Sequence, residues 1–171
     1  MVCADERPGR PAVAGPATGI LPDMASPLLP GDQRRLRRAS AAALATNVFI
    51  VFSGGLVRVT GSGLGCPTWP RCDEESFVPT PGAAHAGWQT AIEFGNRILS
   101  VVVLAAVAAL IWQLYRTRPH PAALMRLAWV LPTGVIAQAL VGGVVVRTGL
   151  APWSVSIHFL LSMILIFAAF A

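Results

Sequence analysis

Few residues in this chain could do chemistry, and the first of them is a histidine within an apolar segment. His158 follows the pair Pro152-Trp153 by about one to two helical turns and has no charged neighbour in the sequence. A neutral imidazole that faces the interior of a helix bundle can ligate haem iron or another metal, or it can hydrogen-bond to another helix. Because polar side chains inside a membrane are costly, His158 is a candidate ligand.

A carboxylate with two polar neighbours begins another apolar segment. Glu93 is followed by Asn96 and Arg97, at i+3 and i+4, so a helix places the three side chains on one face. One interpretation is an interfacial ion pair between Glu93 and Arg97. The other is a carboxylate held beside a buried substrate, where burial tunes it for proton transfer. His85, eight residues before Glu93, is interpreted as a surface histidine.

Two cysteines, Cys66 and Cys72, lie six residues apart in the sequence CPTWPRC. An oxidising exterior favours a disulfide between them, and the two prolines favour the turn that closes it. A redox-active pair and two free thiols are the alternatives. A metal site is less well supported, because no second pair of cysteines or histidines lies nearby.

Four apolar segments must position these side chains. The chain has 171 residues, of which 54% are hydrophobic and 12% charged, with mean hydropathy +0.62. An ordinary soluble domain carries about 25% charge, so this composition excludes a disordered chain and disfavours a water-soluble one. Arginines bound the uncharged segments 39–57, 98–115, 127–146 and 148–171. Each fits the roughly 20 residues that a helix needs to cross a bilayer.

The sequence therefore predicts an all-α membrane protein, built as a four-transmembrane-helix bundle over residues 39–171. The expected spans are 39–58, 91–115, 124–147 and 152–171. Residues 1–38, in which prolines interrupt short apolar pieces, are expected to form a disordered cytoplasmic tail that lacks the pattern of a signal peptide.

The arginines predict the orientation of the bundle in a cell membrane. Nine of the 13 basic residues lie in the tail and in the connection between the second and third spans: Arg7, Arg10, Arg34, Arg35, Arg37, Arg38, Arg116, Arg118 and Arg126. The positive-inside rule makes both regions cytoplasmic and puts the loop of Cys66 and Cys72 outside. The net charge of +5 thus reflects topology, and we expect membrane lipid rather than nucleic acid as a partner.

Two glycine pairs precede arginines at similar offsets, in GGLVRVTG around Arg58 and in GGVVVRTG around Arg147. Glycines let helices or a flat cofactor approach closely. The repetition is explained if two spans simply end alike. Alternatively, the two arginines lie beside a cavity in the bundle and bind the propionates of a haem.

Four segments resemble the haem A synthase family. The sequence GGLVRVTGSGLGCPTWPRC (54–72) resembles the first outer segment of that family, and AIEFGNR (91–97) looks like the carboxylate-bearing start of its second span. QALVGGVVVRTG (138–149) and SIHFLLSM (156–163) are similar to the end of its third span and to its histidine-bearing fourth span. The resemblance covers roughly residues 40–171, and GSGLGCPxWPxC is its most specific part.

The resemblance implies an enzyme of cytochrome oxidase assembly that oxidises the C8 methyl of haem O to a formyl group. The family has eight spans in two similar four-helix bundles, one for the substrate haem O and one for a haem b cofactor. This chain matches the N-terminal bundle, so haem b is expected in a second bundle that the chain does not contain. Partners implied are haem O itself, an electron donor and the enzyme that makes haem O.

The resemblance also assigns roles to individual residues. Glu93 takes the place of the catalytic carboxylate, His158 that of a ligand to the haem iron, and Cys66–Cys72 that of the outer disulfide. The family commonly has a histidine where this chain has Asn96, so the iron is expected to be five-coordinate or to take His85 as a second ligand. Residues expected to surround the haem are Asn96, Arg97, Arg58 and Arg147, and the three arginines are expected to meet its propionates.

Two other classes of protein compete with this interpretation. A non-catalytic b-type haem-binding bundle that carries electrons would normally need two facing histidines within the membrane for each haem. A four-span thiol oxidase coupled to quinone would need an exposed reactive cysteine pair and a second pair to relay electrons. The chain has one widely spaced outer pair, Cys66 and Cys72.

Overall fold

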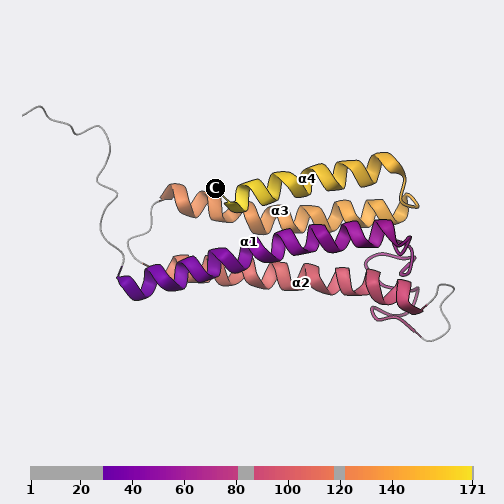
Figure 1. Cartoon of the computed structure of the whole chain (residues 1–171), viewed down its shortest axis with the longest axis horizontal. Helices are drawn as coiled ribbons and strands as arrows, with labels where there is room; N and C mark the ends of the chain where they lie inside the picture. The colour runs from indigo at the N-terminus through magenta and orange to yellow at the C-terminus, as the bar shows by residue number, and fades with distance from the viewer. Residues whose placement is uncertain (1–28, 81–86, 118–121, 171) are drawn as a thin grey trace, which may run out of the picture.

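The computed structural model describes residues 29–80, 87–117 and 122–170. These residues form four helices and no strand: α1 (Pro30–Val59), α2 (Gly87–Arg116), α3 (Ala122–Arg147) and α4 (Pro152–Phe170). The helices run side by side along the long axis of the molecule (Figure 1). All four are long and apolar enough to cross a membrane. The predicted all-α, four-helix membrane fold is therefore confirmed.

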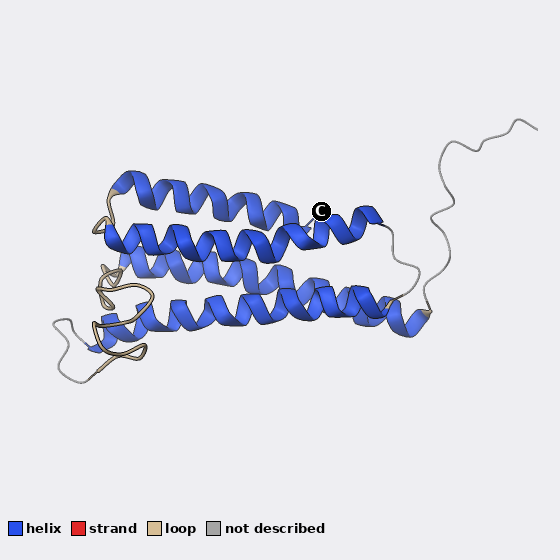
Figure 2. Cartoon of the chain, turned by 180° about the vertical axis from the view of Figure 1, so that it is seen from behind, coloured by secondary structure: helices blue, strands red, loops and turns tan. Residues whose placement is uncertain are grey.

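The four helices pack in a ring in chain order. Helix α1 contacts α2 and α4, and α3 contacts the same two helices, so α1 lies diagonally across from α3 and α2 from α4. Consecutive helices alternate in direction. The segment after α1 and the α3–α4 turn therefore lie at one end of the bundle, which we call the loop end (Figure 2).

Helix α1 begins earlier than the expected span. Residues 30–38 are helical, whereas the sequence assigned them to the disordered tail. Pro30 occupies the first turn, where its missing N–H costs nothing, and Asp32 complements the positive end of the helix dipole. Arginine is a good helix former, so the arginine-rich stretch extends the helix before the apolar span begins. Residues 1–28 lie outside the described residues, and their disorder stays a prediction.

The apolar core fills the half of the bundle away from the loop end. Most of its buried members lie on one face of α2: Val103, Val107, Leu110, Ile111 and Leu114. They meet Ala43 of α1 and Ala128 and Leu131 of α3. The spacing of three and four residues along α2 is that of a helix with one buried face. Large apolar side chains cover the outside of all four helices, as lipid contact requires. The loop end is packed differently, with polar side chains.

Candidate functional site

Residues 60–80 fold over the loop end of the bundle, and we call them the cap. Cys66 and Cys72 form a disulfide within the cap, and both are buried. Gly65 lies so close to α2 that a Cβ atom on it would be 2.7 Å from Cα of Thr90. On the other side, a Cβ on Gly143 of α3 would be 2.6 Å from Cδ2 of Trp69. Two glycines thus allow the cap to contact α2 and α3 closely.

Glu93 lies beneath the cap and is 5% exposed. Its Oε2 accepts a hydrogen bond of 2.8 Å from the backbone N–H of Cys66. Its Oε1 accepts bonds from Nη2 of Arg97 at 2.6 Å and from Nε at 3.2 Å. The i,i+4 ion pair that the sequence suggested is therefore present, and it is joined to the disulfide segment.

All the N–H groups of the Arg97 guanidinium donate hydrogen bonds within the protein. Besides its bonds to Glu93, Nη1 donates to the carbonyl oxygens of Thr68 and Arg71, both at 2.9 Å, and Nη2 donates to that of Cys66 at 2.7 Å. A guanidinium has five N–H donors, and each one here has an acceptor. The expected binding of a haem propionate by Arg97 does not fit this geometry, because a propionate would have to displace one of these partners.

Arg58 and Arg147 differ from Arg97. Both side chains are exposed in the last turns of α1 and α3, at the loop end. Neither makes a hydrogen bond or an ion pair with the part of the chain that the structure describes. Two cationic groups near the loop end therefore keep their donors for an anionic partner.

Asn96 is paired with a residue that sequence reasoning missed. The hydroxyl of Ser53 in α1 donates to Oδ1 of Asn96 at 2.9 Å. Both side chains line a shallow groove of about 310 Å³ between α1 and α2, whose other lining residues include Phe49 and Leu99. Asn96 lies two turns before the buried Val103, on nearly the same face of α2. Ser53 could have been noticed only as a single polar residue in an apolar span.

His158 packs against α3. Neither ring nitrogen has a hydrogen-bond partner among the described residues, and Nδ1 is buried. A Cβ on Gly142 would lie 3.5 Å from Cε1 of the imidazole, so the imidazole lies directly beside this glycine. Nε2 of Gln138 donates to the backbone oxygen of His158 at 3.1 Å and to Oγ of Ser162 at 2.6 Å. Gln138 thus contacts α4 without satisfying the imidazole.

An imidazole without hydrogen-bond partners is suited to bind a metal. A buried nitrogen without a partner costs free energy, and an imidazole with no hydrogen bond to either ring nitrogen can offer one of them to haem iron. Within the described ranges no group of three or more His, Cys, Asp or Glu side chains could hold a metal ion alone. His85, the other candidate ligand, lies outside the described residues.

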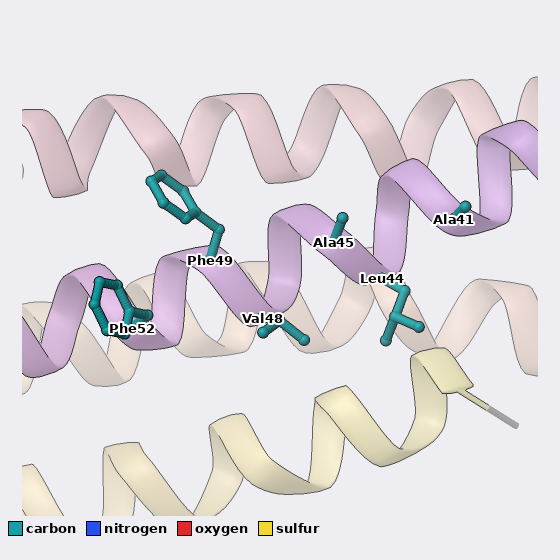
Figure 3. A pocket seen from close by; sticks show the side chains of 6 residues that line it. All are labelled: Ala41, Leu44, Ala45, Val48, Phe49 and Phe52. Atoms are coloured by element: carbon teal, nitrogen blue, oxygen red, sulfur yellow. The ribbon is translucent and has the colours of Figure 1, made fainter.

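A larger hollow of about 560 Å³ runs along α1 and carries no reactive group. Figure 3 shows its lining, in which Leu44 and Val48 point toward α4 and Phe49 points away from it. All six lining side chains are apolar: Ala41, Leu44, Ala45, Val48, Phe49 and Phe52. The candidate site therefore lies at the polar loop end, where Glu93 and Asn96 come from α2 beneath the cap and His158 comes from α4, diagonally across the bundle.

These features define a membrane-spanning four-helix bundle with a disulfide-closed cap, a buried carboxylate and an unpaired histidine at one end. Residues 37–171 match the family model described as cytochrome oxidase assembly protein. The chain belongs to this family.

Curated relatives named heme A synthase share 33% identity with the chain over 121 residues. They include proteins of Bacillus cereus (strain AH187), Bacillus anthracis (strain CDC 684 / NRRL 3495) and Bacillus thuringiensis subsp. konkukian (strain 97-27). The matched region is 68% of this chain but 36% of each relative, so the chain spans only about a third of their length. No solved structure matches the chain significantly.

Proposed function

We propose that this chain is the haem O-binding bundle of a haem A synthase-type enzyme that serves cytochrome oxidase assembly. The family match and the relatives named heme A synthase support the class of reaction. The observation that carries the assignment to this bundle is the unpaired imidazole of His158 at the loop end. In this proposal His158 ligates the iron of the substrate haem O, and haem b belongs to a second bundle of the complete enzyme.

The exposed arginines at the loop end bind the haem propionates. Arg58 and Arg147 have unused donors, and arginine forms bidentate pairs with carboxylates. A haem held in this way would turn its charged edge toward the loop end. The positive-inside pattern of the arginines supports a loop end outside the cell membrane and a cytoplasmic N-terminus.

Glu93 accepts a proton as the C8 methyl group of haem O is oxidised. Conversion of methyl to formyl is a four-electron oxidation that adds one oxygen atom and removes two hydrogen atoms, through two hydroxylations and the loss of water. The oxygen atom and the oxidant are supplied from outside this bundle. Burial under the cap keeps the Glu93 carboxylate away from bulk water, and its bonds to Cys66 and Arg97 fix its position. Proton transfer by a positioned carboxylate contributes about 10²–10⁴-fold to a rate. The sequence has no flavin or nicotinamide motif, so a separate carrier handles the electrons.

The test is product formation. The complete enzyme that contains this bundle is expressed in cells that make haem O but no haem A, and the extracted haems are separated by mass. Haem A is the expected product. A reversible haem spectrum without haem A would contradict the proposal and favour a non-catalytic electron carrier. Against that alternative, His158 is the only histidine among the described residues, whereas a carrier normally uses two.

A further inference from the structure

We propose that Arg97 is a positioning residue, which holds the cap on α2 and thereby fixes the carboxylate of Glu93. Its role is to make the position of Glu93 depend on the closed Cys66–Cys72 ring. The inference rests on the proposed function in one respect, which is that Glu93 is the reacting carboxylate. The structural part, attachment of the cap by Arg97, holds for any activity of this bundle.

The backbone acceptors of Arg97 come from one small covalent ring. The three carbonyl oxygens that it binds belong to Cys66, Thr68 and Arg71, and all three residues lie within the ring closed by the disulfide. A seven-residue segment with its ends joined can turn several carbonyl groups toward one point. The ring therefore presents a set of acceptors that matches the planar fork of a guanidinium.

Cys66 connects the carboxylate to the arginine through its backbone. Its N–H donates to Oε2 of Glu93 at 2.8 Å, and its carbonyl oxygen accepts from Nη2 of Arg97 at 2.7 Å. The same Nη2 also donates to Oε1 of Glu93 at 2.6 Å. Glu93, Cys66 and Arg97 thus form a closed cycle of hydrogen bonds, so displacement of one group moves the other two.

The cycle is largely withheld from water. The side chains of Arg97 and Glu93 are 20% and 6% exposed, and Cys66 is fully buried. Removing one partner from such a pair leaves a buried charge and several buried carbonyl groups without partners, which is strongly unfavourable. We therefore expect loss of the guanidinium to release the cap rather than to leave it in place.

Lysine cannot replace Arg97 fully. Its ammonium group has three donors at one point, whereas the five bonds of Arg97 reach four acceptors on Glu93 and the ring. Arg97→Lys is expected to keep the ion pair with Glu93 and to lose part of the contact with the ring. Arg97→Gln is expected to lose both the ion pair with Glu93 and the contact with the ring. The two variants should therefore weaken attachment of the cap to different degrees.

The first experiment measures attachment of the cap. The chain is purified in detergent, the disulfide is reduced with a soluble phosphine, and the new thiols are alkylated and counted by mass. Arg97→Gln is expected to speed reduction by about tenfold or more, which corresponds to about 1.4 kcal/mol, with Arg97→Lys between it and wild type. Arg71→Gln is the matched control, because the Arg71 side chain is exposed in the same cap and contacts only the carbonyl oxygen of Glu74 and the ring of Phe77, both outside the disulfide ring. An unchanged rate for Arg97→Gln would overturn the proposal.

The second experiment separates positioning from general stability. In the complete enzyme, Arg97→Gln is expected to lower kcat for haem O oxidation while KM stays within about twofold, and Arg97→Lys is expected to recover part of kcat. With both Cys66 and Cys72 changed to Ser, Arg97→Gln is expected to have a much smaller effect, because the ring that Arg97 binds is already open. Additive effects would contradict the proposal. If wild type makes no haem A, the proposed function fails, while the reduction experiment still decides the role of Arg97.

Discussion

The backbone N–H of Cys66 donates a hydrogen bond of 2.8 Å to Oε2 of Glu93, across 27 residues of sequence. One end of this bond belongs to the disulfide ring of the cap and the other to the face of α2 that carries Asn96 and Arg97. The candidate reacting carboxylate is therefore positioned by the loop above it as well as by its own helix.

Glu93→Gln tests the carboxylate itself. The amide oxygen can still accept from Cys66, but the negative charge beside Arg97 and the proton acceptor are lost. We expect haem O binding to be retained and the rate of haem A formation to fall by about 10²–10⁴-fold. The exposed Glu74 of the cap supplies the control variant, Glu74→Gln, which should convert haem O normally. Normal turnover by Glu93→Gln would limit Glu93 to holding the cap.

Gly65→Ala tests the close approach of the cap to α2. The new Cβ would lie 2.7 Å from the backbone Cα of Thr90, so the cap must move away from α2 and carry Cys66 from Glu93. We expect a loss of about 1–3 kcal/mol of stability, measured as a lower Tm in detergent. Gly55→Ala, where the Cβ meets nothing within 4 Å, is the control and should leave Tm unchanged or slightly higher. Equal Tm values for the two variants would contradict the packing described.

The cap is expected to loosen in acid because of Asp73. Hydrogen bonds from the Thr80 hydroxyl and then from the Ser76 N–H hold the pKa of this carboxyl below its usual value. A depressed folded pKa stabilises the folded cap above the unfolded pKa of about 3.9, and that stabilisation disappears as pH falls through the folded value. The protection factor of the Ser76 amide, which is the intrinsic exchange rate at each pH divided by the observed rate, should fall between pH 6 and about pH 2. Asp73→Asn should lack this pH dependence, and an identical profile in both proteins would exclude Asp73 as the cause.

Asn96→His tests the number of iron ligands. A carboxamide is not a usual haem ligand, so wild type should hold haem O with His158 alone and show a five-coordinate, high-spin spectrum. Helices α2 and α4 lie diagonally across the bundle, so an imidazole at position 96 approaches from the side opposite His158. The variant should become six-coordinate and low-spin. A low-spin wild type that becomes high-spin in His85→Ala would instead identify His85 as the second ligand.

The helices were predictable because arginines bound each apolar segment, and charge is excluded from a membrane-spanning helix. The start of α1 was not predictable from the sequence, because a row of arginines is equally suited to a disordered tail and to the end of a helix. The pair of Glu93 and Arg97 follows from i,i+4 spacing, whereas its contact with Cys66 depends on how the cap folds, which local pattern does not encode. For the same reason the sequence could not show that the donors of Arg97, a candidate for binding a propionate, are already bonded within the chain.

His158 was identifiable as an isolated polar residue, but its unsatisfied state depends on what α3 places beside it. Glycine at position 142 offers no hydrogen bond, and Gln138 bonds to the backbone of His158 instead of the ring. A serine or a carboxylate in place of Gly142 could have given the imidazole an ordinary partner. The feature that makes His158 a ligand candidate is thus a tertiary one.

Binding of haem O by purified chain, titrated in detergent and followed by the absorbance of the haem, tests the assignment of His158 most directly. Wild type should bind saturably, and His158→Ala should bind at least about tenfold more weakly with the spectrum of unligated haem. Ser156→Ala, an exposed position on the same helix, serves as the control and should bind like wild type. Equal affinity and an identical spectrum in wild type and His158→Ala would contradict the assignment.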